Sequence, residues 1–384
     1  MTIHTETDPA PAPLVAPPGL KGLIVADTTI GSVRGQEGYY HYRRFDAVEL
    51  ARTQSFESVA ALLVDGELPD AGAEAAFRAE LAAGRLLDPT VTAALAAIAP
   101  LIDSPLGGLR AAISLLASDV PTLDLSPAER RREAVRVAAA VPTVLAALHR
   151  LSHGLEPLAA DPGLSHAADY VRLATGSPPT KAQARAVETY LDLTADHGFN
   201  ASTFTARVVT STGAGIGAVL AAAVGALSGP LHGGAPGRVL DMLDEIGDPA
   251  GVEAWARPVL EAGRPIMGFG HAVYRTDDPR SVLLREVAEG LGGELVARSI
   301  EIEDRILRLL RRWKPEATIV TNVEYYAAVV LHLAGIPQDM FTPTFTTSRV
   351  IGWVAHLLEQ SAANKIMRPA ARYVGPEPSR GRTG

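Results

Sequence analysis

The pattern of apolar and polar positions along this chain is overwhelmingly that of amphipathic helices. Two capping boxes mark helix starts, one at 126–129 (Ser-Pro-Ala-Glu) and one at 180–183 (Thr-Lys-Ala-Gln). The first opens a helix that continues through Leu151, and the second opens a helix towards Ala195. Pro142 is expected to kink or break the first helix, because proline has no amide hydrogen.

The same pattern predicts further helices along the rest of the chain. Ser55 caps a helix through Leu63, which ends at the turn Gly-Glu-Leu-Pro of 66–69. Only two early segments look extended, at 22–26 and 28–33. Because no strands alternate with helices, we expect an all-α protein without a nucleotide-binding parallel sheet. The other predicted helices span 71–84, 107–118, 236–246, 251–262, 280–291, 296–312, 322–334 and 345–363.

One segment is long enough to span a bilayer. From Val208 to Leu231 the chain has 24 residues without a formal charge. Most of them are Ala, Gly, Ser, Thr and Val, which suit a helix packed closely in a protein core. The glycines of 213–217 indicate close helix packing, since they neither match a dinucleotide fingerprint nor follow a strand. We therefore expect a buried helix and no membrane association.

Composition excludes several classes of protein. A formal net charge of −8 argues against a nucleic-acid surface, and the absence of cysteine excludes disulfides and thiolate chemistry. Residues 1–18 are proline-rich and lack the apolar core of a signal peptide, so we expect a disordered lead. The absence of cysteine fits the reducing cytoplasm, where we expect the protein. Residues 376–384 are expected to form a flexible tail. No histidine pair shows a convincing metal-ligand spacing, so no metal is expected.

Histidines set among glycines are the candidate chemical groups. His232 lies in Gly-Pro-Leu-His-Gly-Gly-Ala, and His271 lies in Gly-Phe-Gly-His-Ala-Val-Tyr, shortly before Asp-Pro-Arg. Such turns bring backbone close to a ligand and aim a side chain from a bend. His197 lies in Ala-Asp-His-Gly, and Glu324 ends Thr-Asn-Val-Glu. Imidazoles, a carboxylate and arginines are the groups needed to form a carbanion beside one carbonyl and to add it to a second carbonyl group.

These motifs, in this order and spacing, resemble the citrate synthase family from about Gly19 to Gly375. The resemblance implies an all-α, two-domain fold that works as an intertwined homodimer. A large helical domain would comprise 19–232 and 336–375. A small mobile domain, 233–335, would close over the substrates.

The resemblance also implies how oxaloacetate is held. Arg280, Arg349 and, from the partner subunit, Arg368 match positions that bind its carboxylates, for which planar bidentate guanidinium groups are suited. His197 matches a further oxaloacetate-binding position. His271 would donate a hydrogen bond to the ketone oxygen and stabilise the alkoxide that forms there.

The acyl substrate has its own set of implied residues. His232 would hold the enolate oxygen of acetyl-CoA while Glu324 removes the methyl proton. Arg275 matches a position that contacts CoA phosphate, and Arg264 is a looser candidate for the same role. No cofactor is implied besides the acyl-CoA substrate, and the reaction would serve the tricarboxylic acid cycle.

The chain departs from the family pattern at the proposed base. Most members have Asp where this chain has Glu324, and Ala327-Ala328 stands in place of a usual Ser-Gly. Tyr-Arg-Arg at 42–44 replaces the common Tyr-Arg-Gly. Three functions therefore stay open. The chain is a citrate synthase using Glu324, a 2-methylcitrate synthase using propionyl-CoA, or a catalytically weak paralogue with a binding or scaffold role.

Overall fold

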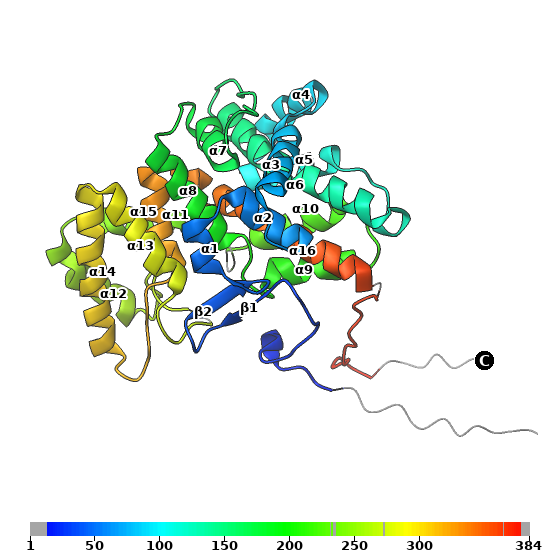
Figure 1. Ribbon diagram of the computed structural model, residues 1–384. Helices are drawn as coiled ribbons and strands as arrows, with labels where there is room; N and C mark the ends of the chain where they lie inside the picture. The colour runs from blue at the N-terminus through cyan, green and yellow to red at the C-terminus, as the bar shows by residue number, and fades with distance from the viewer. Residues whose placement is uncertain (1–13, 231, 233–235, 272, 364, 378–384) are drawn as a thin grey trace, which may run out of the picture.

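The computed structural model describes residues 14–230, 232, 236–271, 273–363 and 365–377. Helices dominate this part of the chain, and one small antiparallel sheet lies near its start (Figure 1). The strands are β1 (Gly31–Arg34), β2 (Tyr39–Tyr42) and β3 (Phe45–Asp46). The helices are α1 (Ala47–Thr53), α2 (Phe56–Asp65), α3 (Ala71–Arg85), α4 (Pro89–Ile98), α5 (Pro105–Leu116), α6 (Pro127–Ser152), α7 (His166–Thr175), α8 (Lys181–Thr194), α9 (Ala201–Thr210), α10 (Ile216–Leu227), α11 (Pro236–Ile246), α12 (Val252–Glu261), α13 (Pro279–Leu291), α14 (Glu294–Trp313), α15 (Val323–Leu333) and α16 (Phe341–Ala363).

Both predicted capping boxes are confirmed. The side chain of Ser126 accepts from the amide of Glu129, whose carboxylate accepts from the amide of Ser126. Thr180 and Gln183 make the same reciprocal pair at the start of α8. These contacts satisfy amides that have no partner within the helix. The predicted helices are present, most of them with ends shifted by a few residues.

Pro142 does not break its helix, so the predicted break is wrong. α6 runs as one helix through this position, and the residues from Ala134 to His149 are almost all buried. A proline inside a helix loses one backbone hydrogen bond, at a cost of about 3 kcal/mol or more. Burial of this stretch on several sides offsets that loss, because tertiary packing supplies most of a helix's stability in a protein.

The uncharged segment 208–231 is not one helix, which corrects the prediction. α9 ends at Thr210, and α10 begins only at Ile216. Gly213 lies between them with φ +80°, a conformation that favours glycine, and Gly215 takes the N-cap position of α10. Leu231, at the end of the segment, lies outside the described residues.

The longest apolar helix is buried. Within the described residues, α6 alone is long and apolar enough to cross a membrane, and 83% of its apolar window lies inside the protein. α3 and the segment Pro89–Leu101 are long and apolar enough to cross a membrane only if they are counted as one span, and the two are bent by 53° relative to each other. α6 is therefore explained as a core helix.

The sheet anchors the segment that leads to His197. β2 pairs with β1 and β3, and its Tyr40 and Tyr42 are each 1% exposed. The Tyr42 hydroxyl donates to the carbonyl of Asp192 at 2.8 Å, and the Tyr40 hydroxyl donates to that of Leu193 at 3.1 Å.

The expected extended segment 28–33 overlaps β1, whereas 22–26 forms no strand. The sequence reasoning predicted no helix at α1, α4 or α7.

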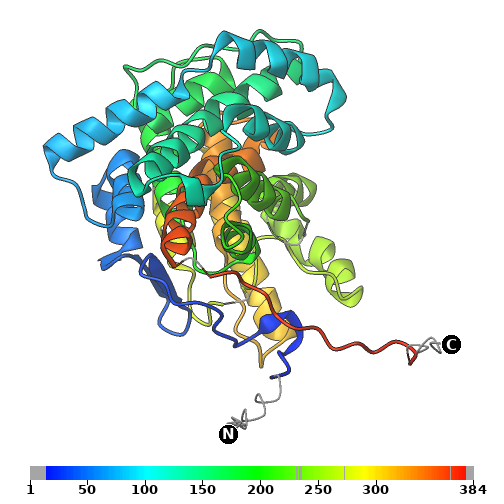
Figure 2. The ribbon, with the colours of Figure 1, turned by 90° about the vertical axis from the view of Figure 1, so that its right-hand side faces the viewer.

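Helices α11 to α15 pack on one another and contact the rest of the chain mainly through α8, α16 and α1. They form the left side of the molecule in Figure 1, and the remaining helices surround α6, α9, α10 and α16. The described ends of the chain leave this helical body as extended segments (Figure 2). Residues 1–13 of the predicted lead and 378–384 of the predicted tail lie outside the described residues.

Close packing of α10 on α5 gives a stability prediction. A Cβ atom on Gly217 would lie 2.8 Å from the Cβ of Ala117, whereas one on the exposed Gly290 of α13 would meet nothing within 4 Å. We expect Gly217→Leu to lower the free energy of unfolding by about 1–3 kcal/mol through overpacking. Gly290→Leu, the matched control, should be neutral or stabilising because leucine favours helices. Urea unfolding of both variants measures this, and equal stabilities would contradict close packing at Gly217.

Candidate active site

A cavity of about 290 Å³ lies where α11–α15 meet the rest of the chain. It brings together three predicted histidines, Glu324 and two of the predicted arginines. The predicted residues Arg264, Arg275 and Arg368 do not line it. Its lining residues are Tyr190, Thr194, His197, Asn200, His232, His271, Arg280, Asn322, Val323, Glu324, Ala327, Phe345 and Arg349.

The loop that carries His271 is joined to the chain just before Glu324. The amide of Gly270 donates to the carbonyl of Val320 at 2.8 Å, and the amide of Asn322 donates to the carbonyl of Gly268 at 2.9 Å. The side-chain amide of Asn322 also donates to the carbonyl of Gly270 at 2.9 Å. Gly268 and Gly270 have φ of +81° and +85°, so this loop requires glycine at both positions.

His271 presents a hydrogen-bond donor to the cavity. Its Nδ1 accepts from the amides of Val273 and Tyr274 at 2.9 and 3.0 Å, so the proton of the neutral ring is assigned to Nε2. Burial, reinforced by Arg280, lowers the pKa of His271 to about 4, and the ring is therefore neutral near pH 7. Nη2 of Arg280 lies 3.3 Å from Nε2. Two adjacent donors favour an electron-rich oxygen between them.

Arg280 is held by a buried carboxylate. Its Nε and Nη2 donate to the two oxygens of Asp278 at 3.0 and 2.9 Å, and Asp278 is fully buried. Burial opposes the charge of Arg280, but Asp278 outweighs it and raises the pKa of the guanidinium. Asp278 also accepts from the amide of Val323 at 3.0 Å, which fixes the start of α15. Asp278 therefore positions the arginine and the Glu324 helix together.

Arg349 supplies a second guanidinium from α16. Its Nε donates to the carbonyl of Thr194 at 2.8 Å, and its guanidinium carbon lies 4.5 Å from the centroid of the Phe345 ring. Only 2% of the residue is exposed. Burial lowers the pKa of Arg349, and nearby Asp196 partly offsets this effect. No described residue forms an ion pair with Arg349, and a buried cation in this situation favours an anionic ligand.

His197 completes the polar wall of the cavity. Its Nε2 lies 3.0 Å from the hydroxyl of Tyr274, which is 1% exposed. Burial, with Arg280 and Arg349 nearby, holds the pKa of His197 well below its usual range. The neutral imidazole can therefore bind a ligand through a hydrogen bond but contributes no positive charge.

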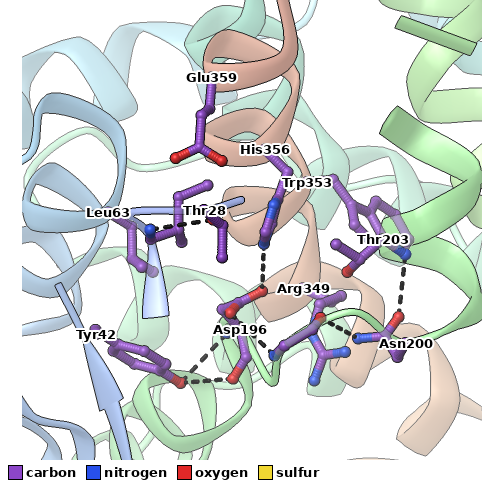
Figure 3. A network of polar contacts seen from close by, with 12 residues as sticks. Thr28, Tyr42, Leu63, Asp196, Asn200, Thr203, Arg349, Trp353, His356 and Glu359 are labelled. Carbon is purple, nitrogen blue, oxygen red and sulfur yellow. Dashed lines mark hydrogen bonds and ion pairs between the residues drawn. The ribbon is translucent and has the colours of Figure 1, made fainter. Parts of the chain in front are cut away.

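Asp196, which precedes His197 in the chain, lies in a network of polar contacts with Tyr42 and His356 (Figure 3). Its Oδ1 accepts from Nε2 of His356 at 3.2 Å, and its amide donates to the hydroxyl of Tyr42 at 3.3 Å. Nδ1 of His356 faces Nη1 of Arg207 at 3.1 Å, so its proton is assigned to Nε2. His356 is buried within this network.

His232 is oriented by the first turn of α9. Its Nε2 lies 3.2 Å from the amide of Ser202 and 2.8 Å from the Ser202 hydroxyl, which in turn accepts from Nε1 of Trp353 at 3.1 Å. The amide assigns Nε2 as an acceptor, so the proton lies on Nδ1. Burial lowers the pKa of His232. Gly233, Gly234 and Ala235, which follow it, lie outside the described residues.

Among the described residues that line the cavity, Glu324 is the one carboxylate. Its amide donates to the side chain of Asn322, the N-cap of α15, at 3.0 Å. Among the residues that the structure describes, none donates a hydrogen bond to its carboxylate. Burial raises the pKa of Glu324 to about 7, although Arg280 opposes the shift. A carboxyl group with this pKa is suited to take up and release a proton near neutral pH.

The whole chain is similar to one group of enzymes. Residues 19–370 match the family model described as citrate synthase, C-terminal domain. The citrate synthase of Haloferax volcanii is 36% identical over 367 residues, covering 93% of this chain and 95% of the relative. The 2-methylcitrate synthase of Mycobacterium tuberculosis is 39% identical over 360 residues, covering 94% of this chain and 90% of the relative. The chain belongs to the citrate synthase family.

A solved structure gives the same result for the fold. The citrate synthase of Thermoplasma acidophilum, in ternary complex with carboxymethyl coenzyme A and oxaloacetate, is 27% identical and superposes with a TM-score of 0.85. The match covers 94% of this chain and 96% of that one. The expected all-α citrate synthase fold is confirmed.

Three arginines predicted for this citrate synthase family member lie away from the cavity. Arg275 is exposed, and its Nη1 donates to the carbonyls of His271 and Tyr274. Arg264 lies beside a separate hollow of about 580 Å³ lined also by Trp255 and Arg238. Arg368 is exposed on the extended segment after α16, outside the cavity of its own chain.

Several residues of this site were not singled out from the sequence. Asp278 was quoted only as part of the motif around Arg280, although an Asp-Pro pair before a helical run is itself an N-cap signal. Asn322 was also quoted within its motif, and its cap on Glu324 follows from the same rule. Ser202 and Tyr274 stood within quoted motifs but were given no role, since their partners lie 30 and 77 residues away.

The buried Asp278 gives a second stability prediction. Asp278→Ala leaves the guanidinium of Arg280 buried without its partner and removes the acceptor for the start of α15. We expect a loss of about 3–5 kcal/mol in the free energy of unfolding. The neighbouring Asp277 is exposed, so Asp277→Ala is the matched control and should change stability little. Urea unfolding checks this, and similar losses for both variants would contradict the assignment.

Proposed function

We propose that this citrate synthase family member condenses acetyl-CoA with oxaloacetate and releases citrate and CoA. The single observation that carries the proposal is the content of one cavity. A carboxylate with a raised pKa, neutral imidazoles with assigned donors, and two buried guanidinium groups line the same space. This is the set of groups that proton abstraction beside a thioester and addition to a keto acid require.

Oxaloacetate is proposed to bind at the arginine side of the cavity. Arg280 and Arg349 pair with its two carboxylates, and His197 donates a further hydrogen bond. The donors of His271 Nε2 and Arg280 Nη2 lie close enough to share one oxygen of the ligand. We also propose that Arg368 reaches this anion from the partner subunit of a homodimer.

The acetyl group is proposed to lie between Glu324 and His232. Glu324 takes a proton from the methyl carbon while the Nδ1–H of His232 donates a hydrogen bond to the thioester oxygen, which becomes an enolate oxygen. The methyl carbon then forms a bond to the ketone carbon of oxaloacetate. His271 donates a hydrogen bond from Nε2 to the oxygen that develops negative charge. The proton that Glu324 took neutralises this oxygen, and water then cleaves the thioester into citrate and CoA.

The surroundings of the reaction are part of the same proposal. We propose that 233–335 moves as a small domain against 19–232 and 336–375 and closes the cavity to water. Support comes from the packing of α11–α15 on one another. Arg275 and Arg264 are proposed to contact CoA. The protein would work without a resident cofactor, in the cytoplasm, for the tricarboxylic acid cycle.

The pKa of Glu324 predicts how kcat/KM depends on pH. Because the base must be ionised and its pKa is about 7, kcat/KM for acetyl-CoA should rise with pH up to about 7 and level off above it. One pH unit below 7 the rate should be about tenfold lower than on the plateau. Glu324→Gln should lose about 10²–10⁴-fold in kcat.

The exposed Glu316 supplies the control, since Glu316→Gln should leave the rate and the pH profile unchanged. A Glu324→Gln variant that retains the parent rate would show that another group is the base. Absence of turnover by the parent with either acetyl-CoA or propionyl-CoA would favour the binding or scaffold role.

A second function, 2-methylcitrate synthesis from propionyl-CoA, is favoured by the 39% identity to the Mycobacterium tuberculosis enzyme. Glu324 is one methylene longer than the aspartate it replaces and so leaves less room for an added methyl group. We expect kcat/KM to favour acetyl-CoA over propionyl-CoA by about 10-fold or more. Glu324→Asp should narrow that ratio. A preference of the parent for propionyl-CoA would overturn the first proposal in favour of the second.

A further inference from the structure

A cluster of metal-ligand side chains lies outside the catalytic cavity. His149 and His153 are one helical turn apart near the end of α6. Asp339 faces them from the 3₁₀ helix Gln338–Met340, which precedes α16. One ligand atom from each of the three residues lies within 4.8 Å of the other two. None of the three lines the cavity, and none has a role in the proposed reaction.

His153 is oriented as a metal ligand. Its Nδ1 lies 2.9 Å from the carbonyl oxygen of His149 and 3.2 Å from the hydroxyl of Ser152. Because a carbonyl only accepts, Nδ1 carries the proton and Nε2 keeps its lone pair. A ring N–H donated to a backbone carbonyl is the arrangement that orients metal-bound histidines. The free Nε2 of His153 lies 4.0 Å from Oδ2 of Asp339, so two electron-rich atoms face each other.

His149 brings the second nitrogen to the same oxygen. Its Nδ1 lies 3.1 Å from Oδ2 of Asp339. In a tetrahedral zinc site with bonds of about 2.0–2.1 Å, ligand atoms are about 3.3 Å apart. The two distances to Oδ2, 3.1 and 4.0 Å, lie on either side of that value. A small rotation of His153, whose side chain is 53% exposed, is enough to bring all three atoms to one ion.

We propose that His149, His153 and Asp339 bind one late first-row divalent metal ion of the Zn²⁺ type. Two imidazole nitrogens and one carboxylate oxygen suit such an ion, whereas Mg²⁺ and Ca²⁺ prefer oxygen ligands. The exposed sides of His153 and Asp339 leave room for water as a further ligand. This proposal departs from the expectation of no metal, because the third ligand is 190 residues away from His149 in the chain.

The ion would join two parts of the chain near the boundary of α11–α15. The 3₁₀ helix that carries Asp339 also carries Gln338, whose side-chain amide donates to the carbonyl of Gly237 and to Asp241 on α11. Metal bonds from α6 would therefore hold the segment that receives α11. A ligand that binds only the folded chain raises its apparent stability.

The test uses the full-length protein after treatment with EDTA and dialysis. Zn²⁺ is added in calorimetric titrations to the parent, His153→Ala and Asp339→Asn. His332→Ala is the matched control, because His332 is exposed and outside the cluster. We expect one Zn²⁺ per chain in the parent and in the control, and an affinity at least about 10-fold weaker in the two cluster variants. Zn²⁺ should also raise the parent's Tm by about 2–5 °C, and Mg²⁺ should not.

We replace His153 and not His149, so that loss of Zn²⁺ binding cannot result from loss of the fold. His149 is only 6% exposed, so its replacement risks unfolding, whereas His153 lies at the surface. His153→Ala should retain the parent's turnover, since the cluster does not line the cavity. Zn²⁺ binding that is equally tight in His153→Ala and the parent would overturn the proposal. So would a parent that binds no Zn²⁺, or one in which Mg²⁺ binds as tightly.

Discussion

The site depends on one buried carboxylate, that of Asp278. It neutralises Arg280 through two hydrogen bonds and accepts from the amides of Arg280 and Val323. Those amides belong to the first turns of α13 and α15, where helix dipoles favour a negative charge. A single group therefore fixes an anion-binding cation and the helix that presents Glu324. Without it, Arg280 would be a buried charge with no partner.

Burial shifts the pKa values of the ionisable groups in the cavity in opposite directions and so gives these groups different roles. It raises the pKa of Glu324 to about 7 and lowers that of His271 to about 4. The carboxylate becomes a base whose protonation changes near neutral pH, while the imidazole remains a neutral donor. Both shifts have the same cause, because a low-dielectric environment disfavours the charged form of either group. The nearby arginines oppose the first shift and reinforce the second.

The helices could be predicted wherever their ends carried local signals. The capping boxes at Ser126 and Thr180 formed as expected because their partners are three residues away. No break occurs at Pro142, since packing against other helices compensates for the lost hydrogen bond. The break near Gly213 was also missed, because the glycines of 213–217 were interpreted as a sign of close helix packing and not as a turn. Local rules fail where tertiary contacts outweigh them.

The sequence by itself determined the family, the all-α fold class and the identity of the candidate groups, because these follow from motifs and helix signals that are local in the chain. Only the tertiary structure brought His197, His271, Glu324 and Arg349 to one cavity and assigned the proton of His271 to Nε2. It also placed Asp339 beside His149 and His153. Proton positions, pKa shifts and ligand clusters depend on neighbours far apart in sequence, and folding alone decides which neighbours meet.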